Sequence, residues 1–530
     1  MTNQRPGSDH GQHVEPTHVP HVDRGLPPAF GDPAEVLRAH ARARPRHVAV
    51  ACGDRSITWA ELDALMDRVA ATLQHEGIEP TRPIAICAAT SIEYLVAFLG
   101  AMRAGVAVAP ISPSLTPQAI VAMIADSGAR RVFADRANAE ALAAANGPLS
   151  VPVTLFDGSP SFESWLRPAG AAPAHVTPGP DWPFNIIYSS GTTGAPKGIV
   201  QPYAMRWTHM QRGPAHGYDA DAVTLISTPL YSNTTLVSVF PTLATGGAIV
   251  LMPRFDAQRY LELAQRVRAS HTMLVPVQYH RIMALPGFGR YDLAAFRAKF
   301  STSAPFAAEL KRDVLARWPG GLTEFYGMTE GGGTCVLQAH VHREKLHTVG
   351  LPAEGHDIRL IDDAGREVAR GGAGEVVGWS PANMMTGYHN RPEATAAAEW
   401  HREGKRFIRT GDVGRFDEDG FLTLVDRKKD MIISGGFNIF PGDLEAVMRE
   451  HPAVSEVAVV GMPSEEWGET PVAFVVRKAG TRENADDIRA WANERLGRMQ
   501  RVAAVHLVAE LPRSAIGKVL KRELRARYAR

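Results

Sequence analysis

Strand-like and helix-like segments alternate along this chain from about residue 34 onward, and no other property of the sequence limits the fold as strongly. Thr58 and Glu61 form a capping box before one apolar helical face, and Pro117 stands at the first turn of a later helix. Near-continuous apolar strands between such helices predict parallel sheets covered on both faces, and hence an α/β fold. The strands are expected at 84–89, 106–111, 131–134, 153–156, 185–188, 223–227, 248–252, 272–275 and 298–302.

The pattern changes near residue 400. Residues 411–422 are rich in Gly and Asp, which is typical of turns between short strands. A charged pentad at 426–430 then precedes a compact unit that ends in a basic helix. We therefore expect three regions, namely a disordered tail (1–28), a large domain with parallel-rich α/β sheets (29–428) and a small α+β domain (429–530).

The charge balance argues against one large class of function. The 530 residues contain 57 Lys and Arg and 56 Asp and Glu, for a formal net charge of +1. A dedicated nucleic-acid binder would show a basic excess. The three cysteines lack metal-ligand spacing, which favours a reducing compartment and argues against a zinc site. The N-terminus lacks the apolar run of a signal peptide, and prolines and glycines interrupt the longest uncharged stretch, 222–253, so we expect a cytoplasmic protein without a membrane span.

The strongest local signal is the segment 188–198, YSSGTTGAPKG, which follows a predicted strand. Its glycines allow backbone N–H groups to close around an anion, its hydroxyl groups add donors, and Lys197 adds positive charge. These properties indicate phosphate binding. The segment differs from the Walker A motif because Pro196 precedes the lysine, and it lacks the glycine spacing of the dinucleotide fingerprint.

This loop resembles the signature of the adenylate-forming superfamily, which includes acyl- and aryl-CoA synthetases, peptide-synthetase adenylation domains and firefly luciferase. Four further segments resemble the other motifs of that family, in the same order. They are EFYGMTE at 324–330, TGD at 410–412, DRKKD at 426–430 and PRSAIGK at 512–518. The resemblance covers roughly residues 34–530, extends to fatty-acid and 4-coumarate CoA ligases, and implies an ATP-dependent carboxylic acid–CoA ligase.

ATP carries several negative charges, so transfer of its α-phosphate requires cations and oriented donors. The resemblance implies that Glu330 binds Mg²⁺ and that Thr329 contacts the α-phosphate, and Mg²⁺ does prefer one or two carboxylates plus phosphate oxygens. It also implies that Tyr326 stacks on adenine and that Asp412 binds the ribose hydroxyls. The implied ATP and AMP contacts are Ser189, Ser190, Gly191, Thr192, Thr193, Gly194, Lys197, Ser303, Ala304, Pro305, Glu324, Phe325, Tyr326, Gly327, Asp412 and Arg427.

Lys518 is the expected catalytic cation. A carboxylate that attacks the α-phosphate brings like charges together, and a lysine between them stabilises both the approach and the transition state. By resemblance, the small domain is mobile and rotates after adenylation about a hinge at Lys429. The rotated state would present Ser434, Gly435 and Gly436 to the CoA tunnel.

The segment 229–236, PLYSNTTL, bears on the identity of the acid. It has no acidic residue, so the ammonium of an α-amino acid would lack a counter-ion there, which argues against amino-acid activation. CoA ligases often have His at the position of Ser232. The sequence therefore does not determine which residue gates the thiol tunnel. The expected pocket favours a hydrophobic aromatic, medium-chain or cyclic aliphatic acid. Its expected residues are Tyr231, Ser232, Asn233, Leu236, Val277, Gln278, Gly331, Gly332 and Cys335.

Two alternatives to a CoA ligase stay open. No carrier-protein domain follows, which favours free CoA as the acceptor, but a stand-alone ligase that loads a carrier protein would share the motifs. A non-catalytic nucleotide sensor on the same fold has no use for Lys518. The expected partners are a small carboxylic acid, ATP with Mg²⁺, and CoA, and a homodimer stays open. Cys335 is expected to line the pocket and not to act as a nucleophile. Five histidines are expected to be structural, namely His271, His280, His340, His342 and His347.

Overall fold

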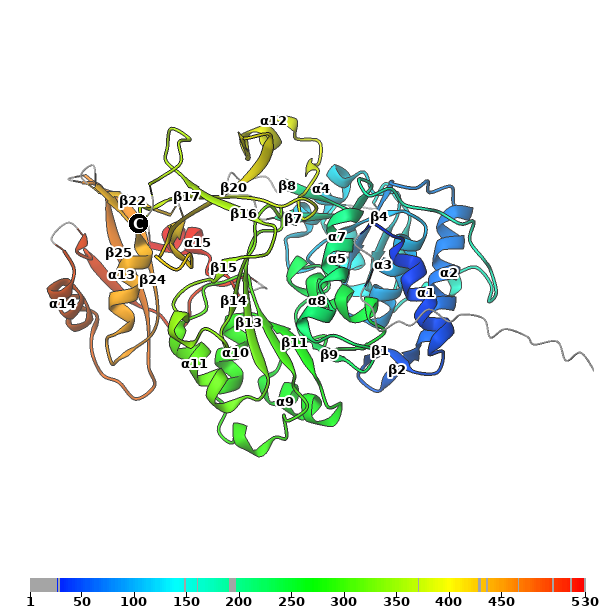
Figure 1. Ribbon diagram of the computed structural model, residues 1–530, viewed down its shortest axis with the longest axis horizontal. Coiled ribbons are helices and arrows are strands. Elements are labelled where there is room, and N and C mark those ends of the chain that lie inside the picture. Colours follow the sequence, from blue (N-terminus) through cyan, green and yellow to red (C-terminus); the bar gives the residue numbers. More distant parts are fainter. Residues whose placement is uncertain are drawn as a thin grey trace, which may run out of the picture.

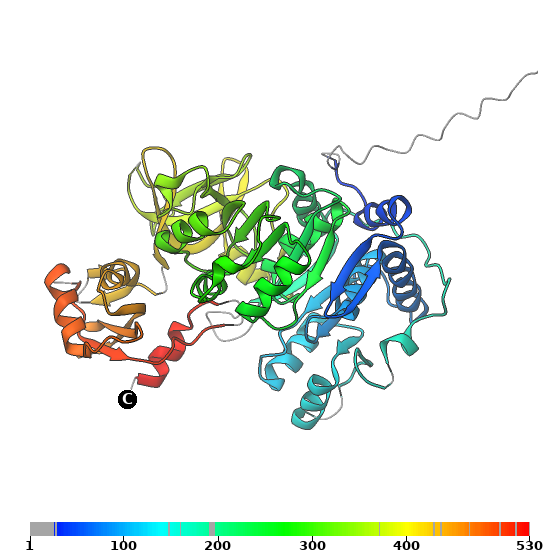
Figure 2. The same ribbon diagram turned by 90° about the horizontal axis from the view of Figure 1, so that it is seen from below.

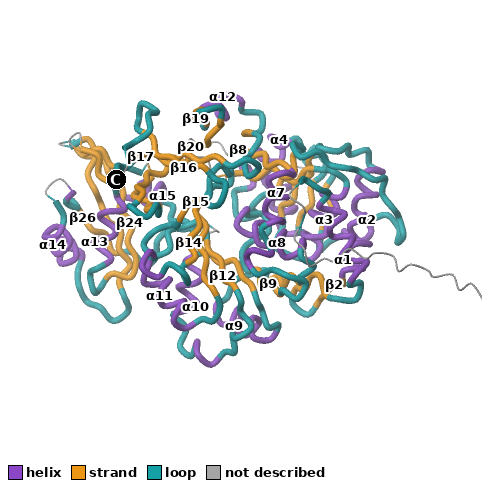
Figure 3. The backbone as a smooth tube through the Cα atoms, viewed as in Figure 1, coloured by secondary structure: helices purple, strands orange, loops and turns teal. Residues whose placement is uncertain are grey.

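The computed structural model describes residue 26 and residues 29–146, 149–159, 161–189, 197–369, 371–427, 430–434, 437–465, 467–497, 500–514 and 517–528. Helices and strands alternate over most of this length (Figure 3). The expected tail at 1–28 lies almost entirely outside the described residues. The main helices are α1 (Pro33–Ala43), α2 (Trp59–His75), α3 (Ile92–Arg103), α4 (Pro117–Ser127), α5 (Arg136–Asn146), α6 (Phe162–Trp165), α7 (Tyr203–Gln211), α8 (Asn233–Ala244), α9 (Ala257–Arg266), α10 (Pro276–Met283), α11 (Ala308–Arg317), α12 (Pro392–Ala397), α13 (Pro441–Arg449), α14 (Ala485–Arg495) and α15 (Lys521–Tyr528).

A seven-stranded sheet forms the first layer of the large domain, in the order β18-β8-β7-β4-β3-β5-β6. Its central strands pair in parallel, and every residue of Pro83–Cys87 is buried, which explains the continuous apolar run in the sequence. The capping box of Thr58 and Glu61 is present at the start of α2, as predicted. The strands are β3 (Pro83–Cys87), β4 (Ala107–Pro110), β5 (Val132–Ala134), β6 (Val153–Leu155), β7 (Pro183–Ser189), β8 (Lys197–Pro202) and β18 (Gly387–Tyr388).

A nine-stranded sheet lies beside it, in the order β15-β14-β13-β12-β11-β9-β10-β1-β2. Its central strands are parallel, and antiparallel strands close both edges. Between the two sheets, α2 packs on α3 and α7 packs on α8 (Figure 1). The strands are β1 (Val48–Cys52), β2 (Arg55–Thr58), β9 (Val223–Ile226), β10 (Ala248–Leu251), β11 (His271–Leu274), β12 (Ala298–Ser301), β13 (Gly321–Tyr326), β14 (Cys335–Gln338) and β15 (Leu351–Pro352).

A third, antiparallel sheet corrects one prediction. We expected turns over 411–422, but β20 runs as a single strand from Lys405 to Phe416. Gly411 has a φ of +70° and bends the strand without ending it. The turn comes later, where the carboxylate of Asp417 accepts the N–H groups of Asp419 and Phe421. The other strands are β16 (Asp357–Ile361), β17 (Gly374–Trp379), β19 (Glu399–Arg402) and β21 (Leu422–Arg427).

The last sheet draws all its strands from residues beyond 430. Its strands have their own buried cluster with α13 and α14. Figures 1 and 2 place this orange and red unit at the end of the molecule opposite the blue N-terminal helices. The strands are β22 (Ile432–Ser434), β23 (Phe437–Ile439), β24 (Val454–Ser464), β25 (Gly468–Arg477) and β26 (Ala504–Leu507). Within the described chain, none of the helices has the length and apolar character needed to cross a bilayer.

Candidate active site

The predicted phosphate loop connects β7 to β8, an antiparallel pair. Ser190, Gly191, Thr192, Thr193 and Gly194 lie outside the described residues, as does the side chain of Ser189. Lys197 begins β8, and its Nζ lies 5.0 Å from the centre of the Tyr388 ring. The Tyr388 hydroxyl donates to Glu330 Oε1 at 2.9 Å. Tyr388 therefore links the lysine of the loop to a carboxylate of the second motif, EFYGMTE.

Tyr388 and Glu330 are arranged as donor and acceptor. Burial, followed by the neighbouring Glu330 carboxylate, raises the pKa of Tyr388, so its hydroxyl stays protonated. One carboxylate oxygen of Glu330 is thereby oriented, and the second is a hard oxygen of the kind that would bind Mg²⁺. A carboxylate held in this way fits Mg²⁺ bound mainly by phosphate oxygens.

Tyr326 and Asp412 come from different sheets and meet directly. The Tyr326 hydroxyl donates to Asp412 Oδ2 at 2.9 Å. Burial, then the Asp412 carboxylate, raises the pKa of Tyr326. On the neighbouring strand the backbone of Arg427 pairs with that of Asp412, although the Arg427 side chain is not among those described. The structure thus brings the expected adenine and ribose residues together.

A buried arginine supports the Thr329 backbone. Arg206 on α7 is fully buried, and it donates to Asn185 Oδ1 at 3.1 Å, to Asn233 Oδ1 at 2.8 Å and to Gln201 Oε1. The Gln201 amide in turn donates to the Thr329 carbonyl at 2.6 Å. Burial lowers the pKa of Arg206 to about 9. Arg206 was missed from the sequence, and its only signal is an arginine on a helix with no other Arg, Lys, Asp or Glu.

A cavity of about 160 Å³ lies at the carboxyl ends of β11, β12 and β13, the edge where parallel α/β sheets bind ligands. Phe325, Gly327 and Thr329 form part of its wall, next to the Tyr326–Asp412 contact. Much of the rest is apolar. The lining residues are Met205, His209, Arg212, His216, Tyr218, Ser232, Asn233, Thr234, Val237, Pro241, Met273, Phe300, Thr302, Ser303, Phe325, Gly327, Met328, Thr329, Thr334 and Asn383.

Of the expected acyl-pocket residues, Ser232 and Asn233 line this cavity. Leu236 does not, because it packs into the buried core beneath α8. Cys335 does not either, because it pairs with Tyr326 across the sheet and packs with Leu360, away from the cavity. This arrangement leaves its thiol, whose pKa is raised by burial, without a place in the chemistry.

The remaining expected acyl-pocket residues also lie off the cavity wall. The Gln278 amide bonds to the carbonyl and hydroxyl of Ser227, both at 3.3 Å. At Gly331 and Gly332 the neighbouring backbone is so close that a Cβ atom would lie 2.2 Å from Asn383 O and 2.7 Å from Gly378 O, respectively. Neither Tyr231 nor Val277 contributes to the wall.

The loop after β12 is strained at the edge of the cavity. Ser303 has a φ of +79°, which is rare for a residue other than glycine. Its hydroxyl lies 2.5 Å from Thr234 Oγ1 on α8, which fixes the loop against the helix. Such strained positions cluster at functional sites. Of the expected nucleotide contacts nearby, Ser303 lines the cavity, whereas Ala304 and Pro305 do not.

Glu324, an expected nucleotide contact, has its carboxylate on the face of β13 that packs on α11. Its carboxylate is buried and forms an ion pair with Lys311 of α11. Side chains alternate along a strand, so Glu324 and the cavity-lining Phe325 lie on opposite faces of β13. The carboxylate therefore faces the protein interior.

The C-terminal motif lies against the large domain. A Cβ atom at Gly517 would lie 2.8 Å from Val277 Cγ1, at the start of α10. The backbone N–H of Lys518 donates to Ser514 Oγ at 3.2 Å, and Arg513 pairs with Glu456 at 3.0 Å. Of the expected hinge and tunnel residues, Ser434 is buried in β22, whereas Lys429, Gly435 and Gly436 lie outside the described residues.

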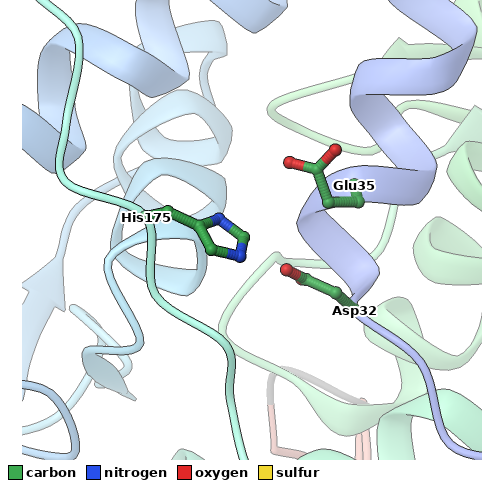
Figure 4. Close-up of side chains that lie close together, drawn as sticks. All are labelled: Asp32, Glu35 and His175. Atoms are coloured by element: carbon green, nitrogen blue, oxygen red, sulfur yellow. The ribbon is translucent and has the colours of Figure 1, made fainter.

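A separate group of ligand atoms lies at the start of α1. Asp32, Glu35 and His175 point toward one another, with the ligand atoms within 4.8 Å (Figure 4). The Asp32 carboxylate accepts the N–H of Ala34 at 2.8 Å as the helix N-cap. Helix capping accounts for Asp32 here, and we assign no function to the group.

Comparison with known proteins agrees with these motifs. The chain matches the AMP-binding enzyme family over residues 37–389 and the AMP-binding enzyme C-terminal domain over residues 443–518. Feruloyl-CoA synthase from Amycolatopsis sp is 34% identical over 92% of this chain and 97% of its own length. Fatty acid–[acyl-carrier-protein] ligase ScoC from Streptomyces coeruleorubidus is 30% identical over 96% of this chain and 98% of its own length.

The likeness extends to three dimensions. The crystal structure of ATP-bound MatB from Rhodopseudomonas palustris has a TM-score of 0.85 to this chain at 28% identity. The match covers 94% of this chain and 99% of that one. The chain is an enzyme of the AMP-binding, adenylate-forming family, to which the AMP-forming acid–CoA ligases belong.

Proposed function

We propose that this enzyme joins a hydrophobic carboxylic acid, either aromatic or medium-chain or cyclic aliphatic, to CoA. The observation that carries the proposal is the adjacency of two features. The Lys197–Tyr388–Glu330 group provides a cation and a carboxylate. The Tyr326–Asp412 pair provides oxygen acceptors for the ribose hydroxyls. A largely apolar cavity opens beside Thr329, where the acid would meet the phosphate.

The reaction has two steps. The carboxylate of the acid attacks the α-phosphorus of ATP, and pyrophosphate leaves to give the acyl-adenylate. The thiolate of CoA then attacks the acyl carbonyl, and AMP leaves to give the thioester. Mg²⁺ held by Glu330 would neutralise phosphate charge. In the first step Lys197 and Lys518 offset negative charge, Asp412 holds the ribose, and the Arg206–Gln201 pair fixes the Thr329 carbonyl.

The identity of the acid is the open part of the proposal. Relatives at about one-third identity are named for both aromatic and fatty acids, such as feruloyl-CoA synthase and long-chain-fatty-acid–CoA ligase FadD13. The apolar part of the cavity accepts either class, since one methylene there changes the binding free energy by only about 1–3 kcal/mol. A panel of aromatic and aliphatic acids, scored by acid-dependent pyrophosphate release and by thioester formation, tests the proposal. Absence of pyrophosphate release with every acid would overturn it.

The second candidate function is loading of an acyl carrier protein. Its support is the 30% identity to ligase ScoC, which is named for an acyl-carrier-protein acceptor. The two acceptors share the pantetheine thiol, so the first step is the same for both. Offering CoA and a pantetheinylated carrier protein in parallel separates them. A thioester formed only on the carrier would replace the CoA proposal.

We expect Lys518 to serve the first step only. In Lys518→Ala, acyl-adenylate formation should fall by about a hundred- to a thousandfold, the typical cost of losing a group that stabilises transition-state charge. Thioester formation from supplied acyl-adenylate should largely survive. Pyrophosphate release and single-step thioester assays measure the two separately.

The matched control is Lys478→Ala, because Lys478 is an exposed lysine in the same C-terminal unit. It should leave both steps unchanged. Equal losses of the two steps in Lys518→Ala would contradict this division of roles.

A further inference from the structure

The cavity contains a positive charge that no carboxylate balances. Arg212 is the one Arg or Lys among its lining residues, and none of those residues is Asp or Glu. Across the part of the chain that the structure describes, the Arg212 guanidinium forms no ion pair, and its Nη2 atom lies 2.9 Å from His356 Nε2. A half-buried cation without a counter-ion is costly unless something else pairs with it. The proposed reaction gives Arg212 no role.

His356 places a second hydrogen-bond donor beside the Arg212 guanidinium. The Nδ1 atom of His356 accepts the backbone N–H of Thr334 at 3.0 Å. A neutral imidazole has only one N–H, so the proton is assigned to Nε2 by this bond. Burial, then the nearby Arg212, lowers the pKa of His356 to about 4, which keeps the ring neutral. The guanidinium and the Nε2–H group are therefore two donors that face each other, and both require an acceptor.

The other polar groups at this end of the cavity supply no negative charge. His209 Nε2 lies 3.0 Å from Asn383 Oδ1, and its Nδ1 lies 3.3 Å from Arg206 Nη1. Burial, then Arg212, lowers the pKa of His216 to about 4. The surrounding imidazoles are neutral, so Arg212 is the one charged side chain among the lining residues.

The backbone of Arg212 lies beyond the end of α7, away from the contact between Gln201 and Thr329. Helices α7 and α8 run side by side in the same sense, since Arg206 bonds to Asn233 near their starts, and a Cβ atom at Gly213 would lie 3.4 Å from Pro241 O near their ends. The rise along α8 from Asn233 to Pro241 is about 12 Å. The Asn233 end is tied through Arg206 and Gln201 to Thr329. The Arg212 backbone is next to Gly213 and therefore lies near the opposite end of α8.

We propose that Arg212 and His356 form a subsite for a second anionic group of the substrate, so that the preferred acid is a dicarboxylate with an apolar spacer. The spacer would lie against Val237, Met273 and Phe300, which are apolar lining residues of the cavity. The second carboxylate takes no part in bond formation, and it provides the acceptor that both donors lack. A guanidinium suits this role because it binds carboxylates through paired, charge-assisted hydrogen bonds. This inference rests on the proposed adenylation of a carboxylic acid.

The test compares dicarboxylic acids with their own monomethyl esters, which keep the shape and remove the second charge. The series should include 1,4-substituted aromatic diacids and α,ω-dicarboxylates of increasing length. The readout is kcat/KM for acid-dependent pyrophosphate release. For at least one spacer the wild-type enzyme should favour the diacid by about 10- to 100-fold, the range expected for a charge-assisted pair.

Arg212→Met should remove this preference by lowering kcat/KM for the diacid, while the monoester is used as well as before or better. Arg212→Lys, which keeps the charge but loses the paired geometry, should retain part of it. The matched control is Arg259→Met, since Arg259 is an exposed arginine on α9. It should leave the ratio unchanged. If Arg212→Met fails to fold, the test rests on two other measurements. These are the diacid-to-monoester ratio of kcat/KM in the wild-type enzyme and the same ratio in Arg212→Lys.

Equal use of diacids and monoesters by the wild-type enzyme would overturn the subsite and leave the proposed function standing. An unchanged ratio in Arg212→Met would do the same. If no acid of either kind releases pyrophosphate, the proposed function fails, and the subsite fails with it.

Discussion

His271 illustrates how single residues support the cavity without taking part in the chemistry. Its ring is fully buried and stacks on Tyr218, with ring centres 4.2 Å apart. Its Nδ1 lies 2.8 Å from Ser270 Oγ, and its Nε2 lies 3.3 Å from the carbonyl of His216. Burial, then Arg297, lowers the pKa of His271 to about 4. The buried ring is therefore neutral, and it holds the segment that carries His216.

This histidine should make folding stability depend on pH. Between its folded pKa of about 4 and its ordinary value of 6.5, the unfolded chain binds a proton at His271 and the folded chain does not. Its contribution to the free energy of unfolding is therefore fully present above pH 6.5 and falls by roughly 2 kcal/mol from about pH 7 to pH 5. His271→Gln should show a weaker pH dependence in urea unfolding. The exposed His47→Gln is the control, and an unchanged pH dependence in His271→Gln would contradict the assignment.

At the scale of elements, a buried ion pair fixes α11 to β13. Lys311 pairs with Glu324, and its ammonium also donates to the carbonyls of Leu346 at 2.8 Å and Thr348 at 3.1 Å. Burial raises the pKa of Glu324 even though Lys311 opposes the shift. The ion pair thus fixes the position of β13 from the face opposite to the one on which Phe325 lines the cavity.

Removing one partner of this pair should be more harmful than removing both. Lys311→Met leaves the Glu324 carboxylate buried and uncompensated, and should lower the free energy of unfolding by about 3–5 kcal/mol. The double variant Lys311→Met/Glu324→Gln should recover part of this loss in denaturant unfolding. A double variant as unstable as the single one would mean that the loss comes from packing and not from the isolated charge.

The same elements show what the sequence can and cannot predict. The alternating apolar pattern was sufficient for most strands and helices, and Phe325, Gly327 and Thr329 of the EFYGMTE segment line the cavity. The face on which each side chain lies was not predicted, as Glu324 and Cys335 show, because it depends on how β13 pairs with its neighbours. The polar groups around Arg206 and Arg212 were missed because they are brought together from distant segments, and none forms a local motif.

At the scale of the whole molecule, the C-terminal unit contacts the large domain through the loop that carries Lys518. Gly517 in this loop has a φ of +76°, and a side chain there would meet Val277 and Val275. Only glycine satisfies both the backbone conformation and the close approach. We infer that this contact belongs to the arrangement in which acyl-adenylate is formed.

Gly517→Ala should therefore impair the first step selectively. The positive φ and the 2.8 Å approach to Val277 Cγ1 both oppose docking, so pyrophosphate release should fall about 10-fold or more. Thioester formation from supplied acyl-adenylate should be largely retained. The second substitution Val277→Ala should recover part of the first step, since it removes the close contact but not the backbone strain.

Gly480→Ala is the matched control for backbone strain. Gly480 lies in the same unit with a φ of +83°, but no atom lies within 4 Å of a Cβ placed there. It should leave pyrophosphate release unchanged. If it slowed the first step as much as Gly517→Ala, the effect would come from the stability of the unit and not from docking.

The side-chain amides that accept hydrogen bonds from Arg206 limit which cavity residues can be changed to alter substrate preference. Asn233 borders the cavity and is an obvious position to redesign, but its side chain also accepts from a guanidinium that solvent cannot reach. Replacing it would leave that ion short of an acceptor and would disturb the Gln201 amide that braces the Thr329 carbonyl. Libraries that vary Val237 and Met273 instead would reshape the space available to the acid while leaving this scaffold intact.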